Sequence, residues 1–286
     1  MDRLIYIPPG TDENDTENTL ELGGMTPCRL ASLTGLGAVE TNAVTMRMAG
    51  QDGAHLQNVT LGPRTVAAAV KIVGRSRAEM LAYRERLIRI LNPKRGAGTL
   101  YYENGRGRYR IEAVATQYGA QGEDAVSRVG NVTVEFFCAS PYWYAADAQR
   151  VRLYEYRAGD AFPASFPLTL QNTWYTPVVV CGAPSEVDTT VAASGPFRDF
   201  TVVNRREGQR LTVRGAVERG ETLILEGAKE RAYILRPDGA VQAVVPEYGY
   251  AYPSVRNGIN ELGVAFGIAG DGAAVTLEWA DKYAGL

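Results

Sequence analysis

The sequence predicts a mainly β protein with one prominent helix, divided into two domains. Short runs of β-branched and aromatic residues, bounded by Gly, Pro and Asn-Gly or Asp-Gly turns, recur along most of the chain. Only one stretch, near residues 76–91, has clear helical periodicity. The 286 residues, 45% of them apolar, exceed the usual length of a chain with a single core. Because the composition becomes entirely strand-like after residues 144–157, we predict domains at 1–147 and 148–286.

The predicted helix begins at Ser76 and ends near Leu91, within GRSRAEMLAYRERLIRILNP. Ser76 and Glu79 have the spacing of a capping box, in which each side chain accepts a hydrogen bond from a backbone N–H at the helix start. Pro93 disfavours helical angles at Asn92, so the helix ends there. One apolar stripe follows the helix, formed by Met80, Tyr83, Leu87 and Leu91.

The segment after the helix, ILNPKRGAGTLYY, has two glycines and two adjacent cations, as a phosphate-binding loop would. Such a loop precedes a helix, so that the helix N-terminus faces the anion. Here the helix comes first, and its C-terminus favours cations such as Lys94 and Arg95. We interpret the segment as a turn between a helix and a strand.

Strand patterns occupy most of the remaining chain. Residues 65–74, 98–116 and 129–144 surround the helix, and Asn104-Gly105 predicts a tight hairpin turn with a positive φ. Val132, Val134 and Phe136 alternate with other residues as in a half-buried strand. The second half predicts an antiparallel sandwich, because strand-like segments and turns recur at short intervals. These segments are 166–172, 176–182, 200–215, 221–227, 231–245, 260–267 and 273–283.

Charge is balanced over the whole chain and uneven along it. The net charge is -2, whereas a nucleic-acid binder usually carries a strong excess of positive charge. Residues 75–110 form a basic band with ten Lys or Arg and three acids, whereas the first 28 residues form an acidic arm with six acids and Arg3. The band and the arm could meet within one subunit or between two, or each could be a solvated face.

Cysteine usage and the N-terminus predict a protein made in the cytosol. Cys28, Cys138 and Cys181 are widely spaced and form no C-x-x-C motif, which argues against a disulfide framework and a zinc site. The first residues have no basic and apolar signal pattern, and no window approaches a membrane span. We expect reduced thiols, no export and no membrane anchor.

No catalytic or metal-binding constellation is evident. His55 is the only histidine and lies in a turn-like segment, where an exposed histidine is far more common than one that forms a base relay with a cysteine or serine. Metal-ligand spacings are missing, and nothing singles out a pair among Glu226, Glu247 and Glu278. We predict no catalytic residue, no metal, no cofactor and no enzymatic activity.

Aromatic clusters leave a ligand-binding interpretation open. Tyr248, Tyr250 and Tyr252 have the spacing of one strand face and could stack on sugar rings. Trp143 lies between two tyrosines and invites the same interpretation. A core edge or a subunit interface is the alternative for both clusters.

Several stretches, in their order, resemble the distal tail protein (Dit) family of long-tailed, non-contractile bacteriophages, the siphophages. The resemblance covers most of the chain from about Leu33. Its most specific parts are LNPK (92–94 with the preceding Leu91), the segment from Asp52-Gly53 to GPR (62–64), and PYW (141–143). Further support comes from SLTGLGAVETN, RVGNVTVEFFCAS, LTVRGAVERGETLILEGAKERAYILRPDGAV and NGINELGVAFGIAGDGAAVTLEWADKYAGL.

The resemblance implies an N-terminal split β-barrel-like domain with one helix, related to tail-tube proteins, and a C-terminal galectin-like antiparallel β-sandwich. It also implies a structural virion protein made in the host cytoplasm. Six copies would form a ring at the tail tip, a baseplate hub between the major tail tube protein and tail-associated or tail-lysin proteins. DNA would pass through this ring without specific binding, and no membrane would be contacted. Ring contacts of this kind are head to tail.

We place candidate contacts with neighbouring subunits or the tube in the basic band, at Arg84, Arg86, Arg89, Lys94 and Arg95. Two other functions stay open. One is a carbohydrate-binding sandwich for host cell-wall recognition, with Tyr248, Tyr250 and Tyr252 as stacking residues. The other is a tail-attached glycosidase, which needs two carboxylates a few ångströms apart.

Overall fold

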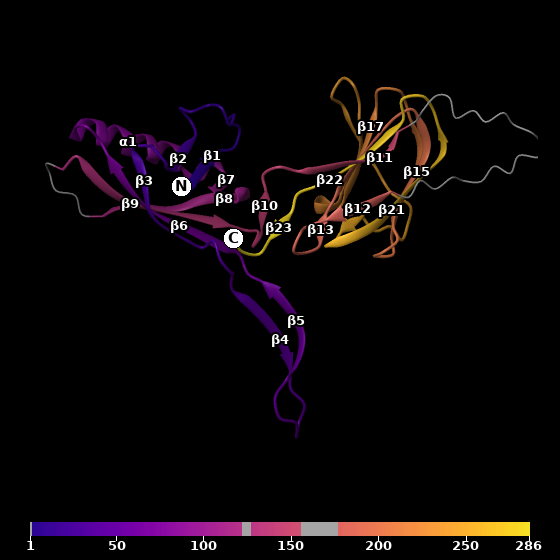
Figure 1. The fold of residues 1–286 in the computed structure, drawn as a ribbon, viewed down its shortest axis with the longest axis horizontal. Helices are drawn as coiled ribbons and strands as arrows, with labels where there is room; N and C mark the ends of the chain where they lie inside the picture. Colours follow the sequence, from indigo (N-terminus) through magenta and orange to yellow (C-terminus); the bar gives the residue numbers. More distant parts are fainter. Residues whose placement is uncertain (1, 122–126, 156–176) are drawn as a thin grey trace, which may run out of the picture. The chain divides into compact units, whose positions relative to one another are not determined.

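The computed structural model describes residues 2–121, 127–155 and 177–286, which form two compact units (Figure 1). The first unit contains residues 1–146 together with Tyr283–Leu286, and the second contains Asp147–Lys282. Over the described residues, no helix has both the length and the apolar character needed to span a membrane. The predicted strand at residues 166–172 lies outside the described residues.

The first unit is built on one antiparallel sheet with the strand order β2-β1-β7-β8-β9-β6-β3. β10 pairs with β8 and β23 beside this path. The two edge strands, β2 and β3, do not pair with each other. They nevertheless lie close together, because a Cβ at Gly23 would be 3.4 Å from Leu30 Cβ. The sheet is therefore a barrel with a split, as expected. The strands are β1 (Arg3–Ile7), β2 (Leu20–Gly23), β3 (Cys28–Thr34), β6 (Arg64–Val73), β7 (Gly98–Asn104), β8 (Gly107–Gln121), β9 (Val129–Cys138), β10 (Trp143–Ala145) and β23 (Lys282–Tyr283).

The α-helix α1 (Arg77–Ile90) follows the predicted boundaries and is the one α-helix among the described residues. Ser76 is its N-cap and accepts from the N–H of Glu79 at 3.2 Å, while the Glu79 carboxylate accepts from the N–H of Arg75 at 2.6 Å. The capping box is thus confirmed, shifted by one residue on the Glu79 side. Met80, Leu87, Ile90 and Leu91 are buried against the sheet.

The turns beside the helix and sheet follow the expected order. Asn92 caps a short 3-10 turn, η1 (Pro93–Arg95), by accepting from the N–H of Lys94 at 3.0 Å. The predicted hairpin between β7 and β8 is present, and Asn104 faces Gly107 across it. The predicted positive φ at Gly105 is wrong. The Asn104 side chain organises this turn instead, by accepting from the N–H groups of Arg106 and Gly107 at 2.8 and 3.1 Å.

The second unit is an antiparallel sandwich, as predicted. A six-stranded sheet has the order β11-β22-β14-β17-β18-β19, and a four-stranded sheet has the order β12-β21-β15-β16. Both sheets contribute to one core, with Val191, Leu223 and Leu225 from the first and Phe200 and Val264 from the second. A short pair, β13 and β20, completes the unit. Its elements are β11 (Gln149–Glu155), β12 (Val178–Cys181), β13 (Val187–Asp188), β14 (Thr190–Ser194), β15 (Phe197–Asn204), β16 (Gln209–Val217), β17 (Thr222–Glu226), the 3-10 turn η2 (Gly227–Lys229), β18 (Arg231–Leu235), β19 (Val241–Val244), β20 (Ser254–Val255), β21 (Gly258–Ala269) and β22 (Ala274–Trp279).

Candidate functional site

An exposed hairpin interrupts the first unit between β3 and β6. Its strands, β4 (Thr41–Met46) and β5 (His55–Leu61), form a two-stranded sheet of their own. Every strand residue is exposed except the half-exposed Leu61, and Figure 1 shows the hairpin extending away from the main sheet of the first unit. Five large apolar side chains nevertheless lie on it, each 42–61% exposed: Val44, Met46, Met48, Leu56 and Val59.

The apolar side chains occupy both faces of this hairpin. Residues that pair directly across two antiparallel strands point to the same face. Leu56 pairs with Thr45, and Asn58 pairs with Val44. Because Val44 and Thr45 are consecutive residues of one strand, they point to opposite faces, so Leu56 and Val44 also lie on opposite faces. Docking one face would therefore leave apolar side chains of the other face in water. A surface of this kind fits between partner surfaces that contact both faces.

The hairpin has little stabilisation of its own. A two-stranded hairpin in water is at best marginally stable when nothing packs against it. The N–H of Gly62 donates to the carbonyl of Glu40 at 2.8 Å and closes its base. Its exposed apolar faces make the hairpin a candidate surface for assembly.

Arg64 anchors the base of the hairpin. Its side chain is buried, and Nη1 donates to the carbonyl oxygens of Gly35 and Gly37 at 2.5 and 2.7 Å. Nε and Nη2 donate to the carbonyl oxygen of Pro141 at 3.0 and 2.9 Å. These partners are backbone carbonyls, whose dipoles stabilise the buried charge, and burial lowers the pKa of Arg64. The contact brings together the GPR and PYW segments. Both segments can be recognised in the sequence, but the sequence does not show that they lie next to each other.

Close packing at the base of the hairpin requires a glycine at position 35. Gly35 has a φ of +86°, and a Cβ there would lie 2.0 Å from the carbonyl oxygen of Thr65. A larger residue would both strain the backbone and push β6 away. The chain can therefore leave β3 towards the hairpin only with glycine at this position.

The acidic arm and the basic band meet within one subunit. Arg86 Nη2 donates to the carbonyl oxygens of Thr16 and Thr19, the second at 3.1 Å. Arg108 forms an ion pair with Glu13. Arg95 Nη2 donates to Thr11 Oγ1 at 3.4 Å. Of the arrangements that the sequence leaves open, contact within the subunit is present in the structure.

The five candidate contact residues thus differ in their surroundings. Arg86 and Arg95 are bound to the arm of their own subunit, and Arg84 also has an interaction within the chain. Arg89 and Lys94 are exposed near the C-terminal end of α1. A role for these residues between subunits stays a prediction.

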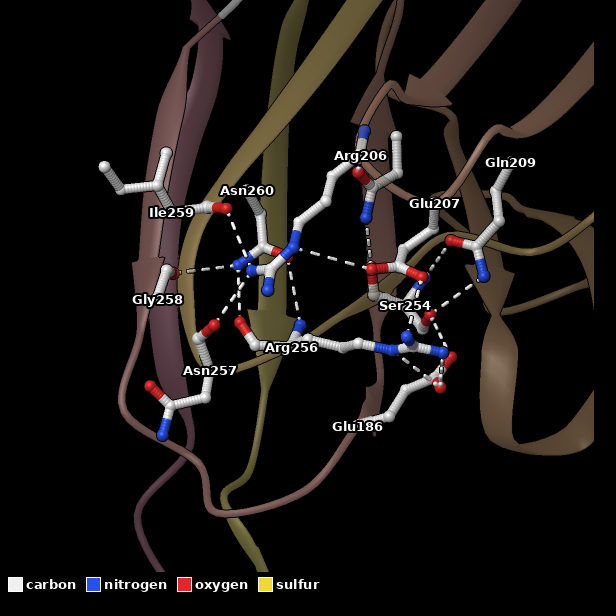
Figure 2. Close-up of polar contacts among 11 residues, drawn as sticks. Glu186, Arg206, Glu207, Gln209, Ser254, Arg256, Asn257, Gly258, Ile259 and Asn260 are labelled. Carbon is white, nitrogen blue, oxygen red and sulfur yellow. Dashed lines mark hydrogen bonds and ion pairs between the residues drawn. The ribbon is translucent and has the colours of Figure 1, made fainter.

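Polar residues of the second unit gather where the β13–β20 pair meets the turn between β15 and β16 (Figure 2). Ser254 Oγ donates to the Glu186 carboxylate at 2.6 Å and accepts from Gln209 Nε2 at 2.8 Å. Arg256 Nη2 donates to the same carboxylate at 2.8 Å. The hydrogen bond from Ser254, followed by Arg256, lowers the pKa of Glu186.

This network fastens loops rather than activating a nucleophile. Ser254 is buried, and its hydroxyl proton is held by Glu186. Asn204 Nδ2 donates to the Ser254 carbonyl at 2.6 Å, and Arg206 Nη1 donates to the carbonyls of Asn257 and Ile259 at 2.8 and 3.0 Å. These donors satisfy backbone groups of the turns, which is a structural role.

The carboxylates considered for glycoside hydrolysis lie in separate ion pairs. Glu226 binds Arg231 at 2.6 Å, Glu247 binds Arg214 at 2.6 Å, and Glu278 binds Arg150 at 2.5 Å. His55 lies at the start of β5, where its Nε2 is 3.2 Å from Gln51 Oε1. The three cysteines are buried and free. No group of three or more His, Cys, Asp or Glu among the described residues is arranged to hold a metal.

The tyrosines at 248, 250 and 252 do not share a strand face, so that prediction is wrong. They lie between β19 and β20 in a segment with a turn, where Gly249 has a φ of +79°. Tyr252 packs against the core and meets Tyr250 edge-to-face at 5.7 Å, while Tyr248 is fully exposed. The turn breaks the alternation that a flat stacking platform requires. Trp143 is also unsuited to stacking on a sugar, because it is completely buried in the core of the first unit.

Comparisons with known proteins agree with this fold. Residues 18–138 match the family model for the phage tail protein RIFT-related domain. A search of curated protein sequences found no significant match. Among solved structures, the Dit protein of phage SPP1, described as a paradigm of the hub adsorption apparatus in Gram-positive infecting phages, has a TM-score of 0.68 at 12% identity over 99% of both chains. A chain of the phage P2 baseplate in its activated conformation with Ca has a TM-score of 0.58 at 9% identity, covering 100% of this chain and 99% of that one.

These findings define the fold of the chain and the relationship of its first unit. Residues 18–138, which lie in the first unit, match the phage tail protein RIFT-related domain. Over its full length the chain has the fold of the SPP1 Dit protein, which agrees with the resemblance to the siphophage Dit family.

Proposed function

We propose that this protein is a structural component of the phage tail tip that assembles with copies of itself into a six-membered ring. The ring would act as a hub between the tail tube and the baseplate proteins. The observation that carries this proposal is the β4–β5 hairpin, whose apolar side chains are exposed on both faces. Rotational head-to-tail assembly would insert the hairpin of each copy against its neighbours and cover both faces.

A non-enzymatic role accompanies the proposal. Glu226, Glu247 and Glu278 are each held by an arginine, and Ser254 is buried within a loop-fastening network. These arrangements favour scaffolding over hydrolysis. The carbohydrate-binding alternative lacks support from geometry, because its three tyrosines do not form a platform.

Oligomeric state tests the proposal. We expect light scattering over a concentration series to show a concentration-dependent rise to six copies, and negative-stain images to show six-fold rings. Val59→Glu should shift assembly to at least about tenfold higher concentration, because a charge in a desolvated apolar contact costs more than ~1.4 kcal/mol.

Val241→Glu is the matched control. Val241 is also an exposed strand valine, 63% exposed against 47% for Val59, and lies on β19 in the second unit. It should assemble as the unmodified protein does. A strict monomer at every concentration, or equal behaviour of the two variants, would count against the proposal.

A further inference from the structure

The C-terminal segment Tyr283–Leu286 belongs to the first unit, although the second unit precedes it in sequence. The Ala284 carbonyl oxygen accepts from Arg64 Nη2, and the N–H of Leu286 donates to the Leu36 carbonyl oxygen at 3.0 Å. A Cβ at Gly285 would lie 3.1 Å from the carbonyl carbon of Gly37, so the two backbones are in close contact. The segment therefore lies along residues 35–37.

Residues 35–37 lead from β3 into the hairpin, and Arg64 begins β6 directly after it. One guanidinium thus holds the entry at Gly35 and Gly37, the exit at its own position and the C-terminal segment. Hydrogen bonds from a charged donor are stronger than those between neutral groups, and a buried guanidinium keeps each of them. The base of the hairpin is therefore built from four separate parts of the chain: residues 35–37, Arg64, Pro141 and the C-terminal segment.

Further contacts fix the C-terminal segment in place. Tyr283 packs edge-to-face on Tyr109 of β8, with ring centroids 5.4 Å apart. Leu286 and Leu36 both pack against the core of the first unit. The segment is held by apolar contacts on each side of the Ala284 carbonyl, which presents that carbonyl to Arg64.

We propose that Arg64 and the C-terminal segment Tyr283–Leu286 form a latch that positions the β4–β5 hairpin for assembly. This inference rests on the proposed function, because it assigns the positioning residues of the same surface. A hairpin on a firmly held base loses less conformational entropy when a neighbour covers it, and so binds more tightly. Without the latch the hairpin would still be present, but its direction would vary.

Hydrogen exchange of the full chain and of a variant lacking residues 284–286 tests the latch. The amide of Gly62, which closes the hairpin base, should exchange about tenfold faster in the variant, since a charge-assisted bond and the Leu286 bond are both lost. The amide of Leu91, bonded to Leu87 at 2.9 Å at the end of α1, should not change. Assembly should require a severalfold higher concentration.

Leu286→Ala and Arg64→Lys extend the test to chains of full length. Leu286→Ala keeps every backbone bond and should have a smaller effect than the deletion, whereas Arg64→Lys lacks the forked donors and should accelerate exchange at Gly62 without removing the charge. If the deletion also accelerates exchange at Leu91, it destabilises the whole first unit, and the exchange rate of Gly62 in Arg64→Lys then tests the latch. Unchanged exchange at Gly62 in Arg64→Lys overturns the latch.

The two proposals fail in different ways. If the unmodified protein stays monomeric, the ring proposal is wrong, while faster exchange at Gly62 in the variants still supports the structural latch. If the unmodified protein forms rings and the variants form them equally well, the positioning role is wrong and the ring proposal stands.

Discussion

Arg64 Nη2 lies 2.9 Å from the carbonyl oxygen of Pro141. This contact joins the GPR and PYW segments, which are 77 residues apart in the sequence. The same guanidinium reaches Gly35 and Gly37. Its replacement by Met should lower the free energy of unfolding of the first unit by about 3 kcal/mol, because buried carbonyls would lose their donors. Calorimetry with Arg106→Met as control, in an exposed turn of the same unit, checks this value. Equal unfolding transitions for the two variants would contradict it.

Arg86 should hold the acidic arm against the first unit. Its Nη2 holds the carbonyls of Thr16 and Thr19, so Arg86→Ala should release the arm and make residues 8–19 accessible to protease. Limited proteolysis with mass spectrometry measures the cleavage rate. Arg89→Ala, on the exposed side of the helix, should leave the rate unchanged. Equal cleavage of both variants would remove Arg86 from this role.

The exposed basic residues are better tests of contacts between subunits than Arg86. Charge reversal at Arg86 would also disturb the arm of its own subunit, which confounds its effect on assembly. We expect the double variant Arg89→Glu and Lys94→Glu to raise the concentration needed for assembly about tenfold, most strongly at low salt. Sedimentation at two ionic strengths would show this dependence, and an unchanged profile at low salt would exclude these two residues from the contacts.

Glu226 should stabilise the second unit in a pH-dependent manner. Its bidentate hydrogen bonds with Arg231, then the bond from Tyr233, lower the pKa of Glu226 from 4.5 to about 2. A depressed folded-state pKa contributes stability above the unfolded value, and this contribution is lost as the pH falls from 4.5 through 2. The exposed Arg231 limits it to about 1 kcal/mol.

Glu226→Gln should therefore be less stable than the unmodified protein at pH 6 and nearly equal to it at pH 2. Urea unfolding monitored across this range measures the difference. Glu261→Gln, at an exposed site of the same unit, is the control. A difference between Glu226→Gln and the unmodified protein that stays constant down to pH 2 would contradict the assignment.

Cys138 should be unreactive in the folded protein. Burial raises the pKa of its thiol to about 12, and the nearby Arg64 only partly offsets this. The thiolate that reacts with iodoacetamide is therefore scarce at pH 8. Mass spectrometry should find Cys138 alkylated in urea and unmodified in buffer. Rapid alkylation without denaturant would show that the thiol is accessible.

Local features of the fold were predictable because their causes lie within a few residues. The helix boundaries follow from Ser76 and Pro93, and the alternation of Val132, Val134 and Phe136 is matched by their burial in β9. The positive φ angles of Gly239, Gly258 and Gly272 follow from Asp-Gly and Asn-Gly turns. Gly105 differs because a side chain, Asn104, supplies the hydrogen bonds that organise its turn.

The tyrosine segment shows where periodicity misleads. Residues 248, 250 and 252 alternate in sequence, but the N–H groups of Glu247 and Ala251 bond to carbonyls of β16 on either side of a turn at Gly249. On that backbone path, set by tertiary hydrogen bonds, the Tyr250 and Tyr252 rings are perpendicular and Tyr248 is fully exposed. Alternation alone does not determine which backbone groups are paired.

The sequence by itself determined the mainly β class, the capped helix and the sandwich pattern, since composition and short-range periodicity encode them. Only the tertiary structure decided that the arm binds its own subunit, that the hairpin is exposed on both faces, and that Arg64 holds its base. These features depend on side chains meeting backbone carbonyls far away in sequence, as Arg64 meets Ala284. A carbonyl is present at every residue, so no pattern of residue types marks the one that a distant donor will reach.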